Sequence, residues 1–169
     1  MQFQRAPGEG RYAHIEREQR WRLPARPAGL VTPTEIVDHY LVGTRLRLRQ
    51  MTSADGTIYK LGQKVRPDEA SPAVVKLTNM YLSPAEYAVL AALPHHELRK
   101  TRWRLGPESR VVVDEFHGAC EGLVLAEVEL AADEPPPAGP VPDAVDVTLD
   151  DRFSGGSLAR TGLVHIGPF

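Results

Sequence analysis

The chain has little cysteine and no long apolar run, and each absence excludes a class of protein. Its 169 residues include one cysteine, Cys120, so an intramolecular disulfide framework is excluded and a reducing compartment is expected. No apolar run approaches the roughly 20 residues that a membrane-spanning helix requires. The first seven residues lack the apolar core of a signal peptide. We therefore expect a cytoplasmic protein with no membrane partner.

The charge of the chain is nearly balanced. The formal net charge is −2 at pH 7, so no overall basic character favours nucleic acid, and any anion selectivity must come from local placement. The length is that of one domain, which we expect to span residues 1–169. Asp133–Pro142 contains five prolines and is expected to form a stiff surface loop of that domain.

Short runs of alternating residues, separated by turn residues, dominate the chain. Residues of the type Ala54-Asp55-Gly56 typically form the turn of a hairpin. Many sequential strands with tight turns favour antiparallel pairing, in a sandwich or a closed barrel. The predicted strands are His14–Leu23, Thr44–Met51, Thr57–Val65, Ala73–Leu82, Leu98–Leu105, Arg110–Phe116 and Leu123–Ala131.

Two segments carry the start signals of a helix. Thr32-Pro33-Thr34-Glu35 places a hydroxyl at the N-cap, proline at the first helical position and glutamate three residues after the cap. Ser83-Pro84-Ala85-Glu86 repeats the pattern and predicts a helix to about Leu93, just before Pro94. A third short helix is expected near Ser157–Thr161.

Charges of one sign are concentrated on single faces of single strands. Residues two apart in a strand share a face, so each acidic pair points one way and so does each basic row. One interpretation is a solvated face with cross-strand ion pairs. The other is a barrel with a polar interior, since paired carboxylates suit Mg²⁺ and rows of arginine suit phosphate. The pairs and rows are Glu16 and Glu18, Glu127 and Glu129, Arg45 to Arg49, and Lys100 to Arg104.

These charged strands resemble a known family in their order along the chain. Glu16-x-Glu18-x-Arg20 resembles the ExExK signature of the CYTH superfamily, the triphosphate tunnel metalloenzymes. The resemblance continues over nearly the whole chain, from about Ile15 to Ala159. The segments that match the family's later motifs are Arg45-x-Arg47, Lys100-Thr101-Arg102, Val113-Asp114-x-Phe116-x-Gly118, Gly122–Glu129, Asp146-Val147-Thr148, Asp151-Arg152-Phe153 and Leu158-Ala159.

The resemblance implies a mainly β (α+β) fold, a single antiparallel eight-stranded β-barrel. Its interior would be a polar tunnel, and short helices would cover the outside. It also implies roles for individual residues. Catalytic roles fall to Glu16, Glu18, Arg20 and Glu129. Phosphate binding falls to Arg45, Arg47, Lys64, Lys100, Arg102 and Arg152. Binding of Mg²⁺ or Mn²⁺ falls to Glu16, Glu18, Asp114, Glu127 and Glu129.

The implied function is metal-dependent hydrolysis of inorganic triphosphate or another triphosphorylated compound. The partner would be a triphosphate or nucleoside triphosphate ligand, with no nucleic acid, and a homodimer is left open. Two alternatives are a polyphosphate- or nucleotide-binding module without turnover, and a class IV-type adenylate cyclase.

The chain departs from the family pattern at two places. Arg20 stands where the signature has lysine, and a guanidinium does not replace an ammonium equivalently. Lys76-Leu77-Thr78 stands where family members often carry an R-x-E-type pair. One acidic contributor is therefore missing, and this absence is the sequence support for the binding module as an alternative to the enzyme.

Overall fold

The computed structural model describes residues 6–66, 74–164 and 166. Its regular elements are nine strands, two α-helices and two single turns of 3₁₀-helix among those residues. The strands are β1 His14–Arg22, β2 Leu30–Leu41, β3 Leu46–Ser53, β4 Gly56–Val65, β5 Val74–Leu82, β6 His95–Leu105, β7 Val112–His117, β8 Val124–Leu130 and β9 Val145–Asp146. The helices are α1 Pro84–Ala91, α2 Gly155–Thr161, η1 Gly118–Cys120 and η2 Asp151–Phe153.

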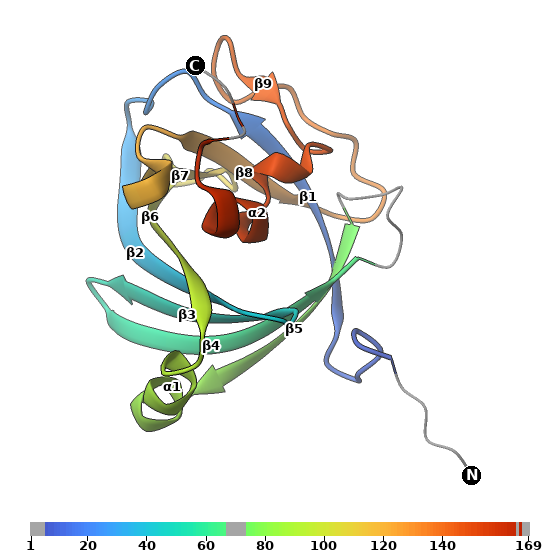
Figure 1. Ribbon diagram of the computed structural model, residues 1–169. Coiled ribbons are helices and arrows are strands. Elements are labelled where there is room, and N and C mark those ends of the chain that lie inside the picture. Colours follow the sequence, from blue (N-terminus) through green and yellow to red (C-terminus); the bar gives the residue numbers. More distant parts are fainter. Residues whose placement is uncertain (1–5, 67–73, 165, 167–169) are drawn as a thin grey trace.

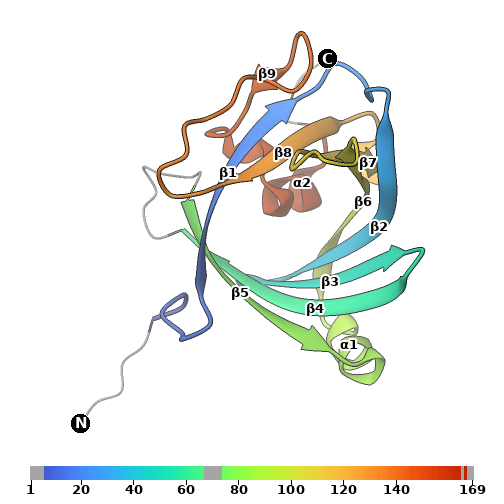
Figure 2. The ribbon, with the colours of Figure 1, turned by 180° about the vertical axis from the view of Figure 1, so that it is seen from behind.

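The strands form a closed antiparallel barrel (Figure 1). The order is β5-β4-β3-β2-β6-β7-β8-β1, and pairing of β5 with β1 closes the ring. Strand β9 adds to the edge of β1 beyond the point where β5 pairs. Seen from behind, β9 lies across the ring from α1, and α2 lies within the outline of the ring (Figure 2). The eight-stranded antiparallel barrel expected from the sequence is therefore confirmed.

The helix expected to begin at Thr32-Pro33 does not exist, because β2 occupies this segment. Residues 30–41 pair with β6 on one side, and residues 35–40 pair with β3 on the other. The register shifts between Val31 and Thr34, and Thr32 has a φ of 51°. Pro33 lies within this irregularity, where a strand tolerates a residue without an N–H donor. The segment with the capping pattern thus forms a β-bulge, and the β-branched residues that follow it favour a strand.

The other predicted elements are confirmed, with ends that differ by a few residues. The turn at Ala54-Asp55-Gly56 joins β3 to β4 as a hairpin. Helix α1 begins with the complete capping box, since Glu86 N–H donates to Ser83 Oγ and the Ser83 N–H donates to Glu86. Ala73, the expected start of β5, lies outside the described residues. None of the helices among the described residues has the length and apolarity to cross a membrane.

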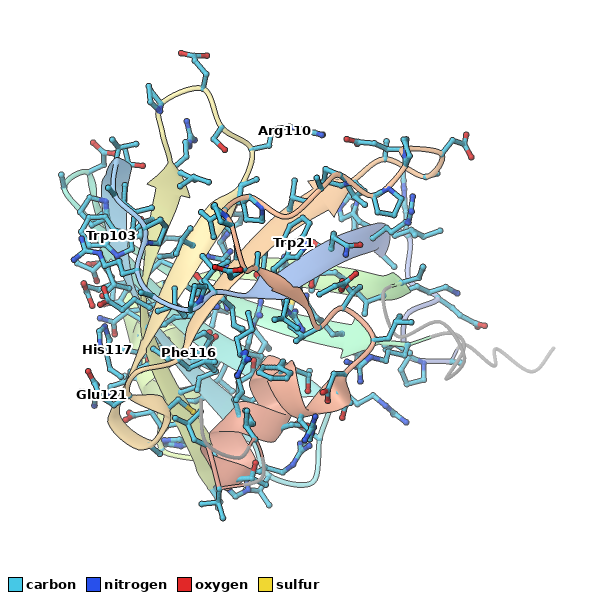
Figure 3. All side chains as sticks on the ribbon, turned by 90° about the horizontal axis from the view of Figure 1, so that it is seen from above. Trp21, Trp103, Arg110, Phe116, His117 and Glu121 are labelled. Atoms are coloured by element: carbon cyan, nitrogen blue, oxygen red, sulfur yellow. The ribbon has the colours of Figure 1, made fainter. Side chains whose placement is uncertain are left out.

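One apolar cluster lies on the outer face of β1, β7 and β8. Its fully or nearly fully buried members include Trp21, and Trp103 packs against it from β6 (Figure 3). The proline-rich segment is mostly exposed, as expected, but Val141 at its end and the nearby Ala144 cover this cluster. The outward-facing apolar residues predicted for a polar-interior barrel are therefore present, and a loop covers them.

A second apolar cluster closes one end of the barrel. Leu158 of α2 packs there against inward-facing side chains such as Leu98 and Phe116. Cys120 lies in the same cluster with 1% of its surface exposed, and its thiol contacts the Leu158 carbonyl at 3.7 Å. Helix α1 lies outside the barrel against β3, β4 and β5, whereas α2 lies inside one end of the barrel.

Candidate functional site

Strand register brings the signature residues together on the inner face of the barrel. Glu18 stands opposite Glu129, and Arg20 stands opposite Glu127, on the neighbouring strands β1 and β8. Directly opposed residues in a sheet share a face, so both acidic pairs point into the tunnel. The polar-interior interpretation of the charged strands is thus confirmed. The basic rows of β3 and β6 face the same interior.

The larger cavity of the tunnel is strongly basic. It has a volume of about 700 Å³ and lies at the end closed by α2. Asp151 is its one acidic lining residue among the described residues, and it pairs with Arg66 at 2.8 Å. The cationic lining residues are Arg20, Arg45, Arg47, Lys64, Arg66 and Arg160, and His96 also lines the cavity.

The smaller cavity contains the glutamates of the signature. Its volume is about 310 Å³, and Arg47 lines both this cavity and the larger one. Carboxylates and cations are mixed here, unlike in the larger cavity. Its charged lining residues are Glu16, Glu18, Glu127 and Glu129 with Arg47, Arg49, Lys60, Arg102 and Arg110.

Two of the four glutamates are already engaged by cations. Glu127 accepts hydrogen bonds from Arg20 at 2.8 Å and from Arg102 at 2.8 Å. Glu18 accepts from Arg20 at 3.1 Å and from Lys64 at 2.9 Å. Arg20 therefore bridges the two acidic pairs, which explains how an arginine is accommodated in place of the signature lysine.

The same contacts keep these carboxylates ionised. Burial alone would raise the pKa of Glu127, but Arg20 and Arg102 outweigh burial, and the pKa lies well below its ordinary value. Burial likewise opposes Lys64 and Arg20 at Glu18, and the net effect lowers the pKa of Glu18. Neither carboxylate is a proton donor at neutral pH.

The other two glutamates are less constrained. Glu16 has Lys64 at 3.4 Å as its cationic neighbour. Glu129 is exposed at the cavity and has no hydrogen bond or ion pair with any residue that the structure describes. Their oxygens are therefore the ones available to a ligand.

Asp114, to which the resemblance implied a metal-binding role, is fully engaged by cations, and Arg102 links it to Glu127. It is 0% exposed and borders neither cavity. Arg102 donates to both of its oxygens at 2.7 Å, and Lys100 donates at 2.5 Å. Lys100 is itself buried and borders neither cavity, whereas Arg102 reaches the smaller one.

Arg152 also lies away from both cavities. Its guanidinium is exposed and donates hydrogen bonds of 2.6 to 3.2 Å to the Asp150 carboxylate. Of the six predicted phosphate-binding residues, the structure brings Arg45, Arg47 and Lys64 to the larger cavity.

Sequence reasoning missed three residues that shape the tunnel, namely Arg66, Arg160 and Asp38, the last of which pairs with Arg49 of the predicted basic row. Arg66 and Arg160 enter the larger cavity from a strand end and from α2, where two-residue spacing gives no signal. Asp38 and Arg49 form a buried pair across β2 and β3. The assignment of residues 32 onward to a helix hid the inward position of Asp38.

The inner face of β5 carries no acidic residue. Val75 stands opposite Glu16, and Leu77 stands opposite Lys64, so these positions and Asn79 face the tunnel. Lys76 and Thr78 alternate with them on the outer face. The residues Lys76 and Thr78, singled out in the sequence, therefore do not face the tunnel, and the inward positions are filled by valine, leucine and asparagine.

No three His, Cys, Asp or Glu side chains of the described ranges are placed to hold one metal ion together. Mg²⁺ does not require such a cage, since it usually keeps several waters and binds one or two carboxylates plus substrate phosphates. The available oxygens of Glu16 and Glu129 fit that smaller requirement.

Comparison with solved structures identifies the same architecture. Two crystal structures of NE1496, described as a hypothetical protein and as an inorganic triphosphatase, match with TM-scores of 0.53 and 0.52 and identities of 22% and 21%. Each alignment covers 85% of this chain, and 97% and 93% of the respective matched chain.

A third match is the PH1819 protein of Pyrococcus horikoshii OT3, with a TM-score of 0.52, 17% identity, and coverage of 70% of this chain and 79% of that chain. No protein-family model and no curated protein matches the chain. The structural likenesses show the tunnel-barrel fold that the CYTH resemblance implied.

Proposed function

We propose that the protein hydrolyses a phosphoanhydride bond of inorganic triphosphate, or of another triphosphorylated compound, with Mg²⁺ or Mn²⁺. The observation that carries the proposal is one cavity lined by six arginine and lysine side chains directly beside a cavity with four glutamates. A triphosphate needs several cations, and its hydrolysis needs carboxylates close to the bound anion. The activity in the description of NE1496, inorganic triphosphatase, is consistent with this chemistry.

The basic residues bind the substrate and stabilise its charge. Arg45 makes no ion pair with the described residues, and the Arg47 Nε is buried without a hydrogen-bond partner among them. Both side chains line the larger cavity and would bind phosphoryl oxygens there, with Lys64 on the neighbouring strand. Positive charge held in place before the reaction lowers the barrier, because it needs no rearrangement as negative charge shifts to the leaving oxygen.

The carboxylates act on the attacking water. Glu16 and Glu129 would accept a hydrogen bond from a water, orient it toward the terminal phosphorus, and take its proton as the anhydride bond breaks. A divalent cation, held by the same two glutamates and the substrate phosphates, would neutralise charge on the phosphoryl oxygens. Glu18 and Glu127 hold Arg20 and Arg102 in place instead.

A second candidate function is binding of a triphosphate without turnover. The specific observation in its favour is the inner face of β5, which offers no carboxylate. The engagement of Glu18 and Glu127 by cations adds to it, because it leaves two glutamates with available oxygens.

One experiment separates the two candidates. The purified protein is incubated with tripolyphosphate and Mg²⁺ or Mn²⁺ across a range of pH, and released phosphate is measured. Steady release supports the hydrolase. Absence of release under every condition, together with tripolyphosphate binding in a calorimeter, would overturn hydrolysis and establish the binding module.

We predict that Glu129→Gln reduces metal-dependent kcat by at least about 100-fold, the size of a lost electrostatic contribution to catalysis. The melting temperature should not change, because Glu129 is exposed and has no partner among the described residues. The matched control is Glu121→Gln, which removes an exposed carboxylate from the turn after η1. Equal rates for wild type and Glu129→Gln would show that this carboxylate is only a surface charge.

A further inference from the structure

Asp38 is a buried carboxylate on the inner face of β2 that has no part in the roles described above. It is 1% exposed. Its Oδ1 accepts from Arg49 Nε at 2.6 Å, and its Oδ2 accepts from Arg49 Nη2 at 2.6 Å. The two parallel hydrogen bonds fix both the position and the plane of the guanidinium.

The same carboxylate is the nearest acidic group to a second guanidinium. Arg47 Nε lies 3.8 Å from Asp38 Oδ1, and this buried Nε has no hydrogen-bond partner among the described residues. One negative charge thus faces two positive charges, and one net positive charge remains for a ligand. Arg47 is the residue that borders both cavities.

Strand register produces this arrangement. Asp38 stands opposite Arg49, and Tyr40 stands opposite Arg47, in the pairing of β2 with β3. The adjacent strand pair, β6 with β7, repeats it, since Asp114 stands opposite Arg102 and is also bound by Lys100. Two buried aspartates therefore each face two cations that lie two residues apart on a neighbouring strand.

The charge of Asp38 does not vary over the working range of pH. Burial alone would raise its pKa, but Arg49 and Arg47 outweigh burial and lower it below the ordinary value of 3.8. The arginines therefore face an ionised carboxylate throughout the neutral range of pH.

We propose that Asp38 is a positioning residue, which orients Arg49 and Arg47 so that their charge is directed at an anion in the tunnel. The inference rests on the proposed function, because it assumes that this anion is a triphosphate. Asp38 does not touch the substrate. It acts by restricting two long side chains that would otherwise have to be ordered when the ligand binds.

The decisive variant is Asp38→Asn, because positioning and simple charge balance predict opposite results. Loss of a negative charge near the arginines would tighten anion binding if charge alone mattered. Loss of the two-point contact should instead weaken tripolyphosphate binding and raise KM by about tenfold or more, with a smaller change in kcat. The control is Asp55→Asn, the same change in charge at the exposed turn between β3 and β4.

A second variant covers the case in which Asp38→Asn fails to fold. Arg49→Lys keeps the charge beside Asp38 but removes the planar two-point contact. We expect it to fold and to bind tripolyphosphate several-fold more weakly than wild type.

Calorimetry with tripolyphosphate distinguishes the possible failures. No binding by the wild type overturns the proposed function and this inference with it. Binding by the wild type, with equal or tighter binding by Asp38→Asn, overturns the positioning role alone. If Asp38→Asn does not fold, wild-type affinity in Arg49→Lys overturns it as well.

Discussion

Single side chains inside the tunnel are held by more than one partner. Arg20 donates to Glu18, to Glu127 and to the Phe153 carbonyl at 3.2 Å, so it joins β1, β8 and the C-terminal segment. The compact ammonium of a lysine does not provide a planar fork that spans three acceptors. The change from lysine to arginine in the signature therefore strengthens the attachment of the C-terminal segment to the barrel.

Asp114 carries a prediction about stability. Asp114→Ala should lower the free energy of unfolding by about 3–5 kcal/mol, because Lys100 loses its ion-pair partner and remains buried, and Arg102 keeps only Glu127. Urea titration followed by circular dichroism measures the change. Glu115→Ala, at the adjacent half-exposed position beside Arg26, should cost less than about 1 kcal/mol. A cost for Asp114→Ala as small as that of the control would contradict the ion-pair network.

For single residues, the sequence predicted which face of a strand a side chain occupies, but not which residue it contacts. Two-residue spacing correctly placed Glu16 and Glu18 on one face, because alternation is a property of any strand. The contacts of Asp114 depend instead on the register of β7 with β6, which local sequence does not specify. Its apparent place among the metal ligands therefore could not be checked from the pattern.

Among the elements, β2 shows how a local signal loses to tertiary pairing. A capping pattern contributes about 1 kcal/mol to a helix. The segment from residue 30 to residue 41 gains ladder hydrogen bonds on both edges and buries Ile36 and Leu41. The same pattern at Ser83 does begin a helix, because α1 lies outside the ring and is not needed to close it.

Helix α2 depends on a glycine at its first residue. A Cβ at Gly155 would lie 2.0 Å from the Tyr40 hydroxyl oxygen, so either the ring or the helix must move. We predict that Gly155→Ala lowers the free energy of unfolding by about 1–3 kcal/mol, the usual cost of overpacking.

The next residue supplies the control. A Cβ at Gly156 meets its nearest atom, Nη1 of the flexible Arg160, at 3.4 Å. Gly156→Ala should therefore be neutral, or stabilising by up to about 1 kcal/mol, because alanine favours a helix. Equal effects of the two substitutions in thermal melts would show that Tyr40 does not fix the position of α2.

For the whole molecule, the order of motifs along the chain predicted a closed barrel, but not the two cavities inside it or the position of α2. Closure needs complementary edges on β1 and β5, and the ordered strands supply them. The larger, basic cavity is bounded at one end by α2, which contributes Arg160 to its lining. A seven-residue helix without a charged pattern gave no sign of that position.

The buried charges predict a loss of stability in acid. The folded-state pKa values of Asp38, Asp114, Glu18 and Glu127 all lie below their ordinary values of 3.8 for aspartate and 4.5 for glutamate. A lowered carboxyl pKa stabilises the fold fully above the ordinary value, and this stabilisation is lost as the pH falls through and below it. The melting temperature should therefore decrease steeply below about pH 4.5.

His39 adds a shallower decline at higher pH. Burial lowers its pKa from the ordinary value of 6.5, so the unfolded chain binds the extra proton more readily below that value. Calorimetric scans from pH 8 to pH 3 measure both effects. A melting temperature that stays constant down to pH 3 would contradict the buried ionic network.

The thiol of Cys120 can report on local opening of the barrel end that α2 covers. Cys120 lies beneath Leu158 of α2, and burial raises the pKa of the thiol, so the reactive thiolate is rare while the helix is in place. A thiol reagent can modify the sulfur only during excursions that open this apolar cluster, of which departure of α2 is one. The labelling rate of the unmodified chain would thus count how often the tunnel opens at that end, without any probe being introduced.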